Sequence, residues 1–173
     1  MVLQPDEGAF GMCGTVEEGR PSPWTVTELT TAERALLTGV RQWFRAGTAG
    51  AMASMRIGLN VAGVPNTALL PLFALLGTFA VSGARKPEIR CPACNRISVD
   101  EIALLDSLAA VQSGDGEVAA QVLDRWLPPV ALFMAADAMG ELGGILDGAR
   151  IFLPRRRIAR LVSLPANAAL AAE

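Results

Sequence analysis

The sequence contains one motif with a clear chemical meaning, a pair of cysteines, Cys91 and Cys94, separated by a proline and an alanine. Two thiolates at this spacing can hold one soft metal ion, and the proline bends the chain into the turn that such a site needs. A structural zinc ion takes four ligands, so further ligands must come from elsewhere. The third cysteine, Cys13, a carboxylate such as Asp100 or Glu101, and a second subunit are the candidates. We therefore predict a zinc site at Cys91 and Cys94, with Cys13 as a further ligand.

Two alternatives to a metal site stay open for this cysteine pair. The motif is similar to one knuckle of a zinc ribbon or rubredoxin-type site, but those sites use two knuckles and this chain has one. Two unligated thiols in a turn are the main alternative. A redox pair of the thioredoxin type would need a strand before the motif and a helix that begins at it. No strand is expected here, and the next helix begins later, at Ser98.

The chain has no histidine and no tyrosine. Because histidine is the commonest general base and metal ligand, its absence excludes Ser-His-Asp and Cys-His nucleophile systems. The single lysine, Lys86, lies in a polar turn, which favours a solvated charge over a Schiff-base nucleophile. No glycine-rich phosphate-binding motif occurs, and a net charge of −2 provides no basic field for nucleic acid. We therefore expect a binding protein rather than an enzyme, and no nucleic-acid partner.

Two groups of charged side chains could bind ions or phosphates. Asp137 and Glu141 are four residues apart in an apolar stretch, so they share one helix face. Such a pair could hold a metal or serve in acid–base chemistry, but a narrow solvated stripe on a buried helix is the favoured interpretation. A basic cluster could meet acidic lipid or phosphate, although a solvated helix face or a partner-docking patch is preferred. The cluster consists of Arg155, Arg156, Arg157 and Arg160.

Helical periodicity and capping signals predict the elements that carry these residues. Thr30 with Glu33 and Ser98 with Glu101 form capping boxes, in which each side chain satisfies a backbone donor at a helix start. No segment shows the sustained alternation of a strand. The fold class is therefore all-α, an irregular helical bundle of about five to seven helices. The expected helices run from 30 or 31 to about 46, 51–59, 67–81, 99–112, 117–126, 130–146 and 155–160.

The length of 173 residues suits one domain, in which 51% of residues are hydrophobic and 18% charged. We expect a flexible N-terminal arm over 1–23, a helical domain over 24–164 and a loose tail over 165–173. No charged residue occurs from Ile57 to Ala84, a run long enough for a membrane span. A turn at residues 64–67 divides this run, which favours a buried central helix. The alternative function is a membrane-associated or complex-embedded accessory subunit that uses this run.

An odd number of cysteines and an acidic start without an apolar leader predict a bacterial cytoplasmic protein, with membrane association as the alternative. The apolar fraction exceeds what one small core needs, so we expect a homodimer or a protein partner. The stretch from Cys91 to Gly116 combines the cysteine pair, Asp100-Glu101 and a Leu-Ala-Ala helix. It resembles uncharacterised small bacterial helical proteins, which implies an all-helical fold and no known activity. A histidine expected before the cysteine turn in that group is missing here.

Overall fold

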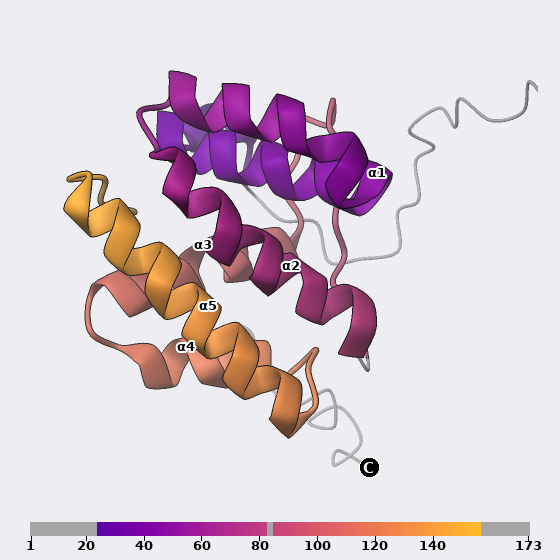
Figure 1. Cartoon of the computed structure of the whole chain (residues 1–173), viewed down its shortest axis with the longest axis vertical. Coiled ribbons are helices and arrows are strands. Elements are labelled where there is room, and N and C mark those ends of the chain that lie inside the picture. The colour runs from indigo at the N-terminus through magenta and orange to yellow at the C-terminus, as the bar shows by residue number, and fades with distance from the viewer. Residues whose placement is uncertain (1–23, 83–84, 157–173) are drawn as a thin grey trace, which may run out of the picture.

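A computed structural model describes residues 24–82 and 85–156 of the chain. Over these residues the fold is all-α, as predicted, and the only pairing of the strand type is a single bridge between Thr25 and Arg96. The predicted N-terminal arm, Cys13 and the residues from 157 onward, with the predicted C-terminal tail, lie outside the described residues. The five described α-helices are α1 (Thr31–Val61), α2 (Leu69–Ser82), α3 (Val99–Gln112), α4 (Gly116–Leu123) and α5 (Pro129–Gly148), with short 3₁₀ turns at Val26–Glu28 and Asn66–Ala68 (Figure 1).

Helix α1 folds back on itself at Gly47, so that its two halves, 31–46 and 48–61, lie side by side (Figure 1). Gly47 has φ 67° and ψ −178°, a conformation that residues with a Cβ rarely adopt. Across the bend, the Trp43 indole N–H donates to the Thr48 hydroxyl at 2.8 Å, and the Ser54 hydroxyl donates to Gln42 at 2.9 Å. The predicted end of the first helix at Gly47 and the second helix after it are thereby confirmed.

Two capping boxes begin helices α1 and α3, as predicted from the sequence. The backbone N–H of Thr30 donates to Glu33 at 2.8 Å, and that of Ser98 donates to Glu101 at 2.8 Å. In return, the hydroxyls of Thr30 and Ser98 accept from the glutamate N–H groups at 3.3 and 3.1 Å. Both glutamate side chains are fully buried. A buried carboxylate needs a positive partner, which is Arg156 for Glu33 and Arg41 for Glu101.

Helices α2 and α5 form an antiparallel pair across the middle of the molecule (Figure 1). The start of α2 lies near the end of α5, where Thr67 and Ile145 line the same surface groove. At the opposite end, the rings of Phe79 and Trp126 meet edge to face at 5.9 Å. Helix α3 packs on α4 and α5 and is buried along nearly its whole length. At Gly143, α5 packs closely on α3, because a Cβ there would lie 3.1 Å from a methyl group of Val111.

The uncharged run from Ile57 to Ala84 does not form one helix. Helix α1 ends at Val61, Gly63 turns the chain with φ 78°, and α2 has 14 residues, fewer than the ~20 needed to cross a bilayer. The predicted buried helix is confirmed for the inner face of α2 only, because Leu70 and Val81 on its outer face are exposed. Among the described residues, α5 alone is long and apolar enough to span a membrane, with a mean hydropathy of 1.3 and 39% of that stretch buried.

The prediction of a basic helix after Pro154 is wrong for the residues at its start. Residues 151–156 form no helix, and Arg157 and Arg160 lie outside the described residues. Arg155 and Arg156 do not form a solvated face, because both turn toward acidic side chains of α1 and α3. The physical reason is that buried carboxylates on those helices attract the nearest available cations.

Candidate functional site

The cysteine pair lies in the connection between α2 and α3. Cys91 and Cys94 are both half-buried. The N–H of Cys94 donates to the carbonyl oxygen of Cys91 at 3.0 Å, which closes the predicted turn over the proline and alanine. The structure therefore confirms the turn, while the third predicted ligand, Cys13, lies outside the described residues.

A buried arginine of α1 holds this turn in place. The Nη1 group of Arg41 donates to the carbonyl oxygen of Cys94 at 2.6 Å, and Nη2 donates to that of Arg96 at 2.8 Å. The same guanidinium grips Glu101 of α3 with Nε at 2.7 Å and Nη2 at 2.9 Å. Arg41 is 3% and Glu101 0% exposed. One ion pair thus joins α1, α3 and the cysteine turn away from solvent.

Glu101 also fixes the other side of the turn. Its Oε1 atom accepts from the backbone N–H of Arg90 at 2.9 Å, and its Oε2 atom accepts from that of Ser98. Both carboxylate oxygens are therefore committed to protein donors. Bidentate pairing with an arginine and two backbone donors leaves this group little capacity to bind a metal.

The neighbouring carboxylate, Asp100, is occupied as well. It accepts from the backbone N–H of Glu88 at 2.8 Å and lies 3.7 Å from the guanidinium of Arg125. Burial lowers the pKa of Arg125 below its ordinary value, and the charge of Asp100 acts in the opposite direction. Within residues 24–82 and 85–156, no three acidic or cysteine side chains gather into a group that could hold a metal. Any metal at the cysteine pair would need further ligands from outside the described residues, such as Cys13, or from a second copy.

A second buried ion pair ties the segment after α5 to the core. The guanidinium of Arg156 pairs with the capping glutamate Glu33, and it lies 5.6 Å from the ring centroid of Trp24. The backbone N–H of Arg156 donates to Asp106 at 2.6 Å. Arg155 makes only longer contacts with acidic groups. Sequence reasoning identified Glu33 as a cap but gave no signal that Arg156, 123 residues later, is its partner.

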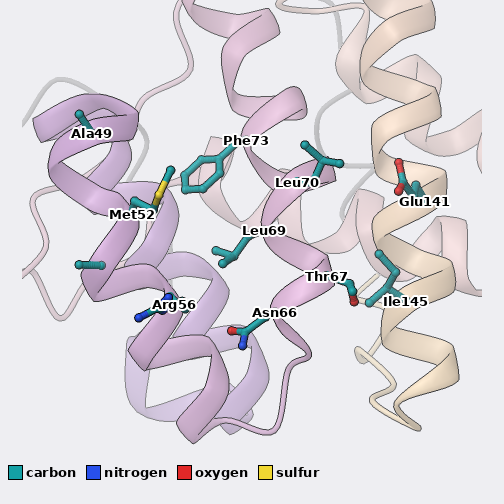
Figure 2. Close-up of a pocket in the computed structure, with 11 residues that line it drawn as sticks. Ala49, Met52, Arg56, Asn66, Thr67, Leu69, Leu70, Phe73, Glu141 and Ile145 are labelled. Carbon is teal, nitrogen blue, oxygen red and sulfur yellow. The ribbon is translucent and has the colours of Figure 1, made fainter.

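An apolar groove of about 810 Å³ crosses the start of α2 between the second half of α1 and the end of α5 (Figure 2). In Figure 2, Met52 of α1 and Phe73 of α2 face each other, while Leu70 lies on the side of α5. Leu70 is 73% exposed at the edge of the groove. The volume and the mostly apolar walls are typical of binding sites. Sequence reasoning missed this groove, because its walls come from three separate segments.

One charge of each sign lines the groove on opposite sides of α2. Arg56 projects from α1, and Glu141 projects from α5 (Figure 2). Both are exposed, and neither forms an ion pair with the residues that the structure describes. Asp137 and Glu141 are both exposed, as predicted, but the helix around them is only partly buried, because Val130, Phe133 and Met134 are exposed as well. Lys86 is exposed as predicted.

Comparisons with known proteins provide no relative from which a role could be transferred. No family model, no curated protein and no solved structure matches this chain. The functional conclusions therefore rest on the geometry and chemistry of the chain's own residues.

Proposed function

We propose that this chain is a non-catalytic helical binding protein, and that the groove across α2 takes a second copy of the chain. The groove carries the proposal, because it combines apolar walls with an exposed leucine, Leu70, at its edge. Covering apolar surface of this kind stabilises a complex by about 25 cal/mol for each Å² removed from water. Exposed apolar side chains that gather on one face are typical of protein interfaces.

The charges along the groove favour a second copy as the occupant. In a two-fold dimer the same surface is used by both chains, so a residue that contacts a second residue is contacted by it in return. Arg56 of one copy can then face Glu141 of the other, and the pair occurs twice. Both side chains are exposed and without ion-pair partners among the described residues, so the pairing displaces no existing contact. Opposite charges across an interface fix its register and exclude wrong partners.

Charge reversal tests this dimer directly. We expect Arg56→Glu and Glu141→Arg each to weaken self-association by about tenfold or more, because each places like charges opposite one another twice. An equimolar mixture of the two variants should associate again, since both contacts across the mixed dimer then join opposite charges. Sedimentation equilibrium of each variant and of the mixture measures this.

The control is Arg45→Glu, which reverses an exposed arginine on the other half of α1, away from the groove lining. It should associate like the parent chain. A parent chain that stays monomeric at high micromolar concentration contradicts the proposal. So does a mixture that associates no better than the two variants alone.

We further propose that Cys91 and Cys94 bind a structural zinc ion that pins their connection to the helical core. The closed turn between them and the rigid support from Arg41 favour a preformed thiolate pair. In the bacterial cytoplasm that we propose for this chain, thiols stay reduced and available. One or both of the two remaining positions are filled by Cys13 or by the cysteines of a second copy. Because zinc binds thiolates, its affinity should fall at acidic pH.

Metal analysis of protein purified without chelator tests the zinc site. One zinc ion per chain is expected where Cys13 of the same chain is the third ligand, and one per two chains where Cys91 and Cys94 of a second copy supply the other two ligands. Cys94→Ser should lower both the zinc content and the melting temperature, whereas Cys13→Ser should do so only in the first case. Absence of zinc and iron, together with a Cys94→Ser variant that melts like the parent, would show that these cysteines are ordinary loop thiols.

A further inference from the structure

The turn from Cys91 to Cys94 is held at both ends by the same buried ion pair. At one end, the backbone N–H of Arg90, the residue before the turn, donates to Glu101 at 2.9 Å. At the other end, the guanidinium of Arg41 donates to the carbonyl oxygen of Cys94 at 2.6 Å. Arg41 and Glu101 are bonded to each other and buried, so both ends of the turn are fixed to one rigid group.

The residues that follow the turn are held by a backbone pairing. The N–H of Val26 donates to the carbonyl oxygen of Asn95 at 2.8 Å, and the N–H of Ile97 donates to that of Trp24 at 3.1 Å. These bonds tie the chain after Cys94 to the segment that precedes α1. The cysteine turn therefore has little freedom to open while the molecule is folded.

The geometry of the turn brings the two thiols within bonding reach. The N–H of Cys94 donates to the carbonyl oxygen of Cys91 at 3.0 Å, and the first and fourth Cα atoms of such a turn lie within about 7 Å of each other. Disulfides join cysteines whose Cα atoms are about 4.4–6.8 Å apart. Both cysteines are thiols in the structure, and both are half-buried, so a small reagent can reach them. A bond between the two sulfur atoms then needs rotation of the side chains and no movement of the helices.

We propose that Cys91 and Cys94 form a reversible disulfide by exchange with a small-molecule disulfide such as oxidised glutathione. The thiolate of one cysteine attacks the glutathione disulfide, forms a mixed disulfide and releases one glutathione. The thiolate of the other cysteine attacks the mixed disulfide, closes the bond within the turn and releases the second glutathione. The two protons of the protein thiols end on the two glutathione thiols, so the chain is oxidised as the reagent is reduced. The fixed ends of the turn favour the second step, because they keep the attacking thiolate beside the mixed disulfide.

The disulfide also regulates the zinc site proposed above, and this consequence rests on that proposal. Zinc binds thiolates, so a chain that carries the disulfide cannot hold zinc through these two cysteines. A reducing compartment keeps the pair as thiols and favours zinc, whereas a rise in small-molecule disulfide expels the ion. This device differs from a redox pair of the thioredoxin type, which depends on a helix that begins at the motif, because α3 begins only at Val99.

Equilibration of the full chain in glutathione buffers of increasing disulfide content tests the inference. Alkylation traps the remaining thiols, and mass spectrometry of the intact chain and of its peptides locates the bond. We expect a disulfide between Cys91 and Cys94, its reversal by dithiothreitol, and the same behaviour in the Cys13→Ser variant. Where the purified chain holds zinc, release of the ion to a chromogenic chelator should follow the same titration.

Two variants with matched controls test the role of the fixed turn. Pro92→Gly should lower the equilibrium constant for disulfide formation by about threefold or more relative to Pro87→Gly, because glycine gives the reduced turn more conformations to lose. Pro87 lies in the same connection but outside the turn. Arg41→Met should lower the constant by a similar factor relative to Arg45→Met, in conditions where circular dichroism shows that both are folded.

Absence of the disulfide in fully oxidised glutathione overturns the inference, and so does a bond that joins Cys13 to Cys91 or Cys94 in its place. Equal constants for Pro92→Gly and Pro87→Gly likewise contradict it, since the turn then has no part in bringing the thiols together. A chain that contains no zinc but forms the disulfide contradicts the zinc site alone and supports the inference. Failure of the zinc site and failure of the disulfide are therefore distinguishable.

Discussion

Arg41→Met is expected to lower the free energy of unfolding by about 3–5 kcal/mol, the range for breaking a buried ion pair by removing one partner. The substitution leaves Glu101 fully buried with no positive partner. It also removes the donors to the carbonyl oxygens of Cys94 and Arg96. Methionine approximately preserves the length of the aliphatic stem, so most of the loss arises from the charge and its hydrogen bonds.

Urea denaturation followed by circular dichroism measures this loss. Arg45→Met makes the same change at an exposed position of α1 and should alter stability by no more than about 0.5 kcal/mol. The double variant Arg41→Met, Glu101→Gln should recover part of the loss, because it removes the unpaired buried charge. Equal stabilities of Arg41→Met and Arg45→Met would contradict the structural role of the pair.

Arg41→Met should also loosen the cysteine turn. Arg41 is the side chain that holds the carbonyl oxygen of Cys94, so without it the connection between α2 and α3 opens more readily. The thiols should then react faster with a thiol reagent than those of the Arg45→Met control, in conditions where both variants remain folded.

The second large effect is expected for Arg156→Met, with a loss of about 3 kcal/mol or more. Glu33 is fully buried, and Arg156 is its cationic partner. The variant also loses the contact of the guanidinium with the Trp24 ring, and such contacts contribute about 0.5–1 kcal/mol at exposed sites. Equilibrium denaturation measures the change.

Arg155→Met is the neighbouring control. Its Nε atom lies 4.0 Å from Asp106 and its Nη2 atom 3.5 Å from Asp115, and its side chain is partly solvated, so the loss should be at most about 1 kcal/mol. Glu33→Gln combined with Arg156→Met should regain stability relative to Arg156→Met alone. If Arg155→Met and Arg156→Met are equally stable, the C-terminal cluster is a solvated surface after all.

Local structure in this chain follows from interactions between residues close in sequence. The capping boxes at Thr30 and Ser98 were predictable because each box joins two residues three positions apart. The bend at Gly47 was predictable because few other residues adopt a positive φ there. The cysteine turn was likewise indicated by a motif of four residues. Interactions between residues only a few positions apart therefore determine the helices and the all-α class, whatever the packing of one helix against another.

The ion-pair partners of the buried glutamates were not predictable from interactions between residues close in sequence. Glu101 and Arg41 are 60 residues apart, and Glu33 and Arg156 are 123 residues apart. The chain has many arginines, and neither their type nor their spacing distinguishes the two that enter the core from those that stay in solvent. The choice depends on which helix faces meet, and that is a property of the packed structure.

The sequence by itself determined that this protein is helical, that Cys91 and Cys94 share a tight turn, and that histidine chemistry is excluded. Only the tertiary structure decided that α2 is apolar on an exposed face as well as on a buried one, and that Met52, Phe73 and Leu70 gather around one groove. The physical reason is that the hydrophobic effect favours the burial of apolar side chains but has no direction. Which apolar side chains are buried, and which stay exposed, therefore depends on how elements distant in sequence pack together.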